Sequence, residues 1–203
     1  LICFIGSGLF WYFYSIRNQI KSSFLKNAIT PLLLIIISLS LFQVLNVIGE
    51  RQTKYSVDNM FATIQTAQDW HSQISQESKT YSLGNYDQSF LGLLRIMPEA
   101  VFIAVFRPFI WESGFGLMLL SAIENLFITF LVLNLLFKHS FRALKAFTSE
   151  PILIYCFIFT ITLAFMVGVS SYNFGALTRY RVSFIPLLLS AIIIVQHKLN
   201  IVK

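Results

Sequence analysis

The chain has 203 residues, of which 56% are hydrophobic and only 12% are charged, whereas roughly 25% of the residues of a soluble domain carry a charge. A soluble core cannot bury this much apolar surface, so the composition excludes an ordinary soluble domain. The net charge of +6 does not indicate nucleic-acid binding, because the Lys and Arg residues lie mostly beside apolar segments and form no long basic run.

Apolar segments long enough to cross a bilayer recur along the chain, and each crossing needs about 20 residues of helix. They predict an all-α fold, a polytopic transmembrane helical bundle that forms a single domain over residues 1–203. The chain starts at Leu1, and its first apolar segment does not look like a signal peptide. We therefore interpret the whole chain as the C-terminal part of a longer protein. Five segments are predicted to span the membrane: about 1–16, 28–48, 113–137, 151–170 and 182–196.

Basic residues near the ends of these segments predict the orientation, because short cytoplasmic loops are rich in Lys and Arg. We therefore expect segments 17–27 and 138–150 and the C-terminus to face the cytoplasm. The residues that lead to this assignment are Arg17, Lys21, Lys26, Lys138, Arg142, Lys145, Lys198 and Lys203.

The slightly acidic segment 49–88 is then expected to be an outer, periplasmic loop. Within it, apolar residues recur at roughly helical spacing, namely Phe61, Ile64, Ala67 and Ile74. Asp58 precedes them and is a residue type that favours the start of a helix. This pattern predicts a short amphipathic helix that lies on the membrane or on the bundle.

The next apolar segment, 89–111, is interrupted by charged residues and prolines. It follows an outer loop and precedes a span that runs inward, so it must cross the membrane an even number of times or not at all. Its length is too short for two crossings at about 1.5 Å per residue. We therefore predict an interfacial or re-entrant helix on the outer face, covered by protein or water where its backbone is irregular. The interrupting residues are Arg95, Pro98, Glu99, Arg107 and Pro108.

The end of this segment is the first candidate site. Arg107, Trp111 and Glu112 lie among aromatic residues at the predicted outer interface. An arginine at this depth can reach phosphate groups, which indicates substrate binding by Arg107 and Trp111. The alternative is an aromatic belt with an arginine that extends toward the lipid headgroups.

The second candidate is Glu124, which precedes Asn125 within the span 113–137. A carboxylate inside a span costs roughly 2.5 to 3.5 kcal/mol, so it must face a partner or water or be protonated. A proton-relay or substrate role is one interpretation. An interhelical hydrogen bond that holds the bundle together is the other.

The third candidate is the segment 171–181, which is predicted to be a short outer loop. It carries Arg179 and Arg181, although the orientation rule expects few basic residues on that side. If the segment is extended, both side chains point the same way and could bind one phosphate or carboxylate together. Binding of lipid headgroups is the alternative.

Motifs of soluble cofactor enzymes are absent from the sequence, including the P-loop, the dinucleotide glycine motif, HExxH and GxSxG. We therefore expect no cofactor. Cys3 and Cys156 lie inside apolar segments without metal-ligand spacing, so they are expected to be buried thiols and no metal site is predicted.

Short motifs in the second half resemble membrane proteins of bacterial polysaccharide gene clusters. The motif that begins at Arg179 also resembles a late segment of polyprenyl-phosphate-sugar-dependent glycosyltransferases and of O-antigen-polymerase-like proteins. In those glycosyltransferases a catalytic acid lies in an early outer loop, and no residue of this chain matches it. Ser183 also stands where the pattern has a proline. The motifs are Arg107–Glu112, Ser121–Asn125, Asn173–Arg181 and Arg179–Pro186.

This resemblance implies a multi-pass protein of the bacterial inner membrane that handles a lipid-linked glycan at the outer face, as a glycosyltransferase or polymerase. Arg107, Arg179 and Arg181 would contact the pyrophosphate of a polyprenyl donor, and Glu112 or Glu124 would act as acid or base. A transporter or flippase for an anionic substrate and a non-catalytic scaffold subunit remain as alternatives. The expected partners are membrane lipids, a polyprenyl-pyrophosphate-linked glycan and other membrane subunits, but no nucleic acid.

Overall fold

The structure is a computed structural model that describes residues 2–20, 66, 70, 80–84, 87, 89–114, 116–147 and 149–201. The predicted span 28–48 and nearly all of the predicted amphipathic helix in the loop 49–88 lie outside the described residues.

Every regular element of the described ranges is a helix, which confirms the all-α prediction. An isolated bridge between Thr80 and Asn173 is the one extended pairing among them. The helices are α1 (Ile2–Gln19), α4 (Phe90–Phe106), α5 (Leu117–His139), α6 (Phe141–Phe147), α7 (Pro151–Ser171), α8 (Phe174–Arg181) and α9 (Ile185–Ile201).

Two of the described helices, α5 with 23 residues and α7 with 21, are long and apolar enough to cross a membrane. They match the predicted spans 113–137 and 151–170. Helices α8 and α9 meet at a bend of 59° and give a third candidate if the pair forms one span. Helix α1 covers the predicted span 1–16 but is not among these candidates. The described residues thus provide two or three of the five predicted spans.

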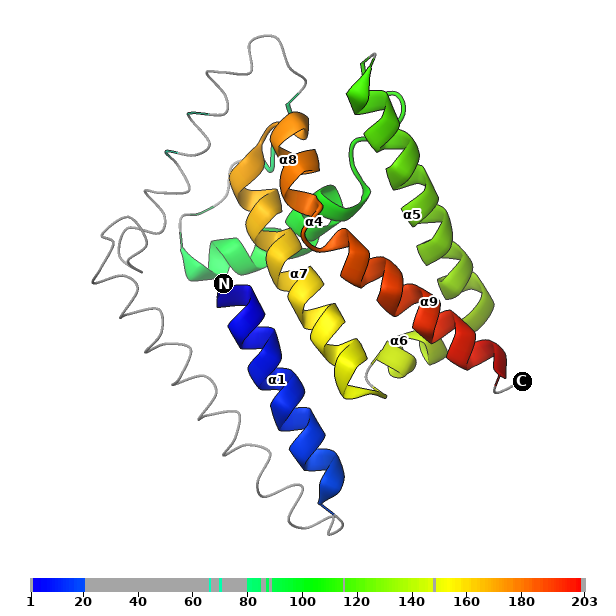
Figure 1. The fold of residues 1–203 in the computed structure, drawn as a ribbon. Coiled ribbons are helices and arrows are strands. Elements are labelled where there is room, and N and C mark those ends of the chain that lie inside the picture. Colours follow the sequence, from blue (N-terminus) through cyan, green and yellow to red (C-terminus); the bar gives the residue numbers. More distant parts are fainter. Residues whose placement is uncertain are drawn as a thin grey trace.

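Helix α4 lies across α7 near the C-terminal end of α7, whereas α1 packs alongside α7 (Figure 1). The crossing is close because Gly168 of α7 has no side chain. A Cβ atom added there would lie 2.2 Å from the carbonyl oxygen of Ala100 in α4. The interfacial or re-entrant role of segment 89–111 stays a prediction, and α4 forms its regular part.

The opposite end of the bundle contains α6, the start of α7 and the end of α9 (Figure 1). There the Lys198 ammonium donates to Glu150 Oε1 at 2.6 Å and to Ser149 Oγ at 3.0 Å. These contacts bring segment 138–150 and the C-terminal segment together, as expected of two segments on one side of a membrane.

The main core lies where α4, α7, α8 and the first turn of α9 meet. It includes the fully buried side chains of Phe174, Leu177 and Phe184. These residues fix α8 against the bundle, so the polar residues at its end are held in place. The candidate site lies beside this core.

Candidate functional site

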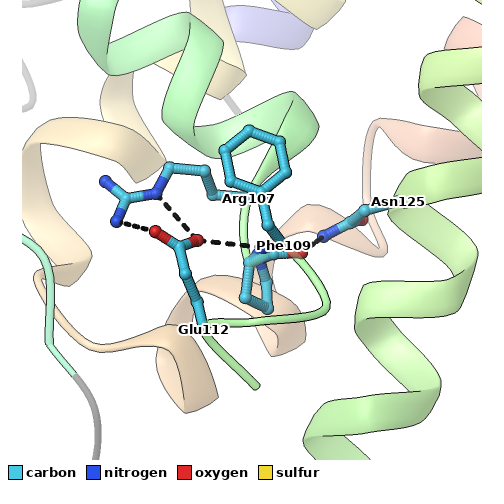
Figure 2. A network of polar contacts seen from close by, with 5 residues as sticks. Arg107, Phe109, Glu112 and Asn125 are labelled. Atoms are coloured by element: carbon cyan, nitrogen blue, oxygen red, sulfur yellow. Dashed lines mark hydrogen bonds and ion pairs between the residues drawn. The ribbon is translucent and has the colours of Figure 1, made fainter.

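The chain leaves α4 at Arg107 because Pro108 disfavours helical backbone in the residue before it. In the following turn, Arg107 Nε donates to Glu112 Oε2 at 3.0 Å, and Arg107 Nη2 pairs with Glu112 Oε1. The backbone N–H of Phe109 also donates to Glu112 Oε2, at 2.9 Å. Figure 2 shows this network, in which a two-pronged ion pair closes the turn.

Aromatic rings hold the same arginine from the other side. The Arg107 guanidinium carbon lies 5.2 Å from the ring centre of Phe174 and 6.0 Å from that of Tyr81, distances at which a ring attracts a cation. Tyr81 donates its hydroxyl hydrogen to the carbonyl of Gly168 at 2.9 Å and stacks on Tyr172. Burial raises the pKa of the Tyr81 phenol, so the ring stays neutral at ordinary pH.

The segment 171–181, predicted to be a short outer loop, is mostly helical, so the loop prediction was wrong and the extended backbone that would pair the two arginines is not present. Asn173 starts α8 by accepting a hydrogen bond from the backbone N–H of Gly175 at 2.6 Å, a residue type that caps helices well. Two residues along a helix point roughly 200° apart. Accordingly Arg181 is 1% exposed, whereas Arg179 is exposed on another face. The two arginines therefore do not form the expected pair.

Arg181 contacts the turn after α4 from inside the protein. Its Nη1 donates to the carbonyl oxygen of Arg107 at 3.3 Å. Its Nε and Nη2 are buried and have no hydrogen-bond partner among the described residues. Nε and Nη2 form one edge of the Arg181 guanidinium. The corresponding edge of the Arg107 guanidinium binds the Glu112 carboxylate.

Asn125 of α5 reaches the next carbonyl of the same turn. Its Nδ2 donates to the carbonyl oxygen of Pro108 at 3.1 Å (Figure 2). Its Oδ1 is buried without a hydrogen-bond partner in the described structure. Consecutive carbonyls, those of Arg107 and Pro108, are thus held by α8 and α5.

Glu124 lies beside this group on the exposed side of α5, while Ser121, Asn125 and Ile128 form its buried face. The Glu124 carboxylate is close enough to act electrostatically on the Arg181 guanidinium. The expectation that this carboxylate faces a partner or water, or is protonated, stays a prediction.

Trp111 is 77% exposed and stacks on Phe109, with ring centres 4.8 Å apart. It belongs to the same turn as the ion pair but points outward. The turn thus presents an aromatic ring to its surroundings and a carboxylate to Arg107.

The structure brings Arg107, Glu112 and Arg181 together and places Glu124 near them. Sequence reasoning named Asn125 beside Glu124 without giving it a site role of its own, and it missed Tyr81. Asn125 had a signal, because a polar amide next to a carboxylate is unusual in an apolar span. Tyr81 had none, since its partner Gly168 lies 87 residues away in the chain.

No group of three His, Cys, Asp or Glu side chains in the described part of the chain is arranged to hold a metal ion. Cys156 is buried, Cys3 is half-buried, and both are free thiols. Comparison with protein-family models, with curated proteins and with solved structures found no match, so the functional argument rests on the site itself.

Proposed function

We propose that the chain is a membrane component of cell-surface glycan assembly that binds the phosphate group of a polyprenyl-linked substrate, in a transferase or polymerase reaction. The observation that carries this proposal is the buried edge of Arg181. Its Nε and Nη2 have no partner among the described residues, although the side chain is 1% exposed.

A buried guanidinium needs an acceptor, because an unpaired buried charge is strongly destabilising. The edge formed by Nε and Nη2 has two parallel N–H donors that fit two oxygens of a phosphate or carboxylate. Arg107 demonstrates this geometry within the same molecule, since its corresponding edge binds both oxygens of Glu112. Arg181 therefore offers a matching position for an anion that does not belong to the described residues.

The glycan part of the proposal is supported by the position of the sequence resemblance. Three of the resembling motifs meet at this site, and the third lies far from the other two in the chain. Arg107 and Glu112 belong to one motif, Asn125 to a second and Arg181 to a third. Convergence of these motifs on a buried arginine favours recognition of a shared anionic ligand over three unrelated packing contacts.

Within this proposal the two acidic residues have different tasks. Glu112 accepts hydrogen bonds from Arg107 and from the Phe109 backbone, so it positions the turn whose carbonyl oxygen Arg181 contacts. Glu124, exposed beside Arg181, is the carboxylate that can approach a substrate hydroxyl as acid or base.

The experiment is a binding measurement with the purified chain in lipid nanodiscs. Polyprenyl phosphate should bind and the uncharged polyprenol should not. Arg181→Gln should weaken phosphate binding by at least about tenfold, because hydrogen bonds to charged groups contribute about 1.5–3 kcal/mol. Arg95→Gln, which changes an exposed arginine of α4, is the matched control and should leave the affinity unchanged. Equal affinity of the Arg181 variant and the wild type would refute the proposal.

One observation favours a transporter or flippase as the second candidate. Arg181 ends α8 at the bend of 59° before α9, and many transporters bind substrates at such breaks in their helices. Proteoliposomes supplied with lipid-linked sugars separate the two functions. Extended or transferred glycan indicates the transferase or polymerase, whereas movement of an unchanged anionic substrate across the bilayer indicates the transporter. If neither glycan transfer nor transport is detected, the scaffold subunit is favoured.

A further inference from the structure

The amide of Asn125 has a fixed orientation. Its Nδ2 must face the Pro108 carbonyl, because that contact of 3.1 Å requires a donor. Oδ1 therefore points away from Pro108 as an acceptor. Asn125 is 1% exposed, and Oδ1 has no donor among the residues that the structure describes. Buried polar atoms are nearly always hydrogen-bonded, so Oδ1 indicates a missing donor.

Arg181 presents the complementary problem, since its Nε and Nη2 are donors without acceptors. Both residues are anchored at their other ends to neighbouring carbonyls, those of Arg107 and Pro108. Both side chains therefore approach the turn after α4, Asn125 from α5 and Arg181 from α8. A single ligand that has two acceptor oxygens and one donor would satisfy both.

We propose that Arg181 and Asn125 together bind a phosphate monoester, whose P–O–H group donates to Asn125 Oδ1 while two other oxygens accept from Arg181 Nε and Nη2. This inference rests on the proposed function and makes it more specific. It assigns the site to the sugar-free polyprenyl phosphate that is released when the glycan is transferred, because a phosphate diester has no P–O–H group. Asn125 is then the residue that determines specificity.

Proton content is what the test varies. A phosphate monoester has a second pKa near 6 and can keep one proton at little cost near neutral pH, whereas a sulfate monoester keeps none. A sulfate or a phosphate diester still offers two oxygens to Arg181, but it presents only acceptors to Asn125 Oδ1. Sites that hydrogen-bond a ligand hydroxyl discriminate strongly against analogues that lack it, because a buried group is left unpaired.

The experiment compares prenyl phosphate, its methyl diester and prenyl sulfate for binding to the wild-type chain in nanodiscs at about pH 5, where the phosphate monoester keeps one proton and all three ligands carry a single negative charge. Prenyl phosphate should bind at least about tenfold more tightly than either analogue. Inorganic phosphate is a further probe, and weaker binding of it than of prenyl phosphate would assign the ligand to a lipid rather than to free phosphate.

Asn125→Ala should reduce the preference for prenyl phosphate over prenyl sulfate to about twofold or less. Arg181→Gln should weaken binding of both. Asn134→Ala, which changes a second asparagine of α5 outside the site, is the control and should keep the wild-type preference. The wild-type comparison needs no variant, so the test stands even if Asn125→Ala does not fold.

Each remaining outcome contradicts either the role of Asn125 or the proposed function as well. Equal binding of phosphate and sulfate, both lost in Arg181→Gln, would overturn the role of Asn125 and leave the proposed function intact. Tighter binding of both anions by Asn125→Ala would show that Oδ1 instead competes for the Arg181 N–H groups, which also overturns the inference. Absence of binding by the wild type to all the anions would overturn both proposals.

Discussion

The two ends of the described bundle use similar ion pairs in different surroundings. At one end Lys198 pairs with Glu150, and their side chains are 40% and 50% exposed. At the other end Arg107 pairs with Glu112, and their side chains are only 22% and 18% exposed. Solvent screens the first pair, whereas protein surrounds the second, so equal changes should have unequal effects.

The difference indicates what each end is built for. The exposed pair joins the end of α9 to the start of α7 and needs no further support. In the enclosed pair, the rings of Tyr81 and Phe174 lie against Arg107. Arg181 donates a hydrogen bond to the Arg107 carbonyl, so the same short turn is held from both sides. Such a network requires close packing of α4 on α7.

The largest expected effect is at the crossing of α4 and α7. Gly168→Ala would place a Cβ atom 2.2 Å from the carbonyl oxygen of Ala100, so the helices must separate. We expect a loss of about 2–3 kcal/mol in the free energy of unfolding, as in other overpacked cores. Denaturation in SDS or by heat measures it.

The control for this change is Gly8→Ala, because a Cβ atom added to Gly8 of α1 would meet nothing within 4 Å. Alanine is favoured over glycine inside a helix by about 0.5–1 kcal/mol, so this variant should be as stable as the wild type or more so. Similar losses in both variants would show that the close crossing has no special role.

The second prediction concerns the enclosed ion pair. Glu112→Gln leaves Arg107 without its counter-ion and should cost about 1–2 kcal/mol, less than for a fully buried pair because some solvent reaches both side chains. It should also weaken anion binding at Arg181, since Glu112 holds the turn whose carbonyl Arg181 contacts. Glu99→Gln, at an exposed position of α4, is the control, and an equal effect there would contradict this prediction.

A smaller loss is expected for Tyr81→Phe, which removes the hydroxyl that donates to the Gly168 carbonyl at 2.9 Å. One buried hydrogen bond contributes about 1 kcal/mol, and the ring stacking on Tyr172 is kept. Tyr180→Phe changes an exposed tyrosine and should have no measurable effect on the melting temperature. A difference of zero between the two variants would show that the hydroxyl does not hold the segment before α4 in place.

Sequence pattern was sufficient for the long apolar helices. Helices α5 and α7 could be predicted because their apolar length alone satisfies the bilayer requirement. Helix α8 was missed because it has only eight residues and two residues at its start, the N-cap Asn173 and Gly175, are also typical of loops. The N-cap role of Asn173 was the signal that could have identified it.

The site could be predicted only in part, for a related reason. Charged residues in an apolar chain identified Arg107, Glu112, Glu124 and Arg181, but pairing depends on geometry that spacing does not contain. The wrong prediction for α8 also made the predicted arginine pair wrong, because Arg179 and Arg181 would share a face in a strand but do not in a helix. The bond from Asn125 to a carbonyl exists only because two helices meet at one turn.

The smallest effect is expected at the exposed pair. Lys198→Gln and Glu150→Gln should each change the free energy of unfolding by less than about 1 kcal/mol, because solvent already solvates both charges. A double-mutant cycle isolates their interaction, and raising the salt concentration should reduce it further through screening. The same salt change should affect the cost of Glu112→Gln much less, since protein and aromatic rings cover most of the Arg107 side chain, which is 22% exposed. An interaction between Lys198 and Glu150 that is large and independent of salt would mean that this end is also enclosed, for example by another subunit, and the contrast between the two ends would no longer hold.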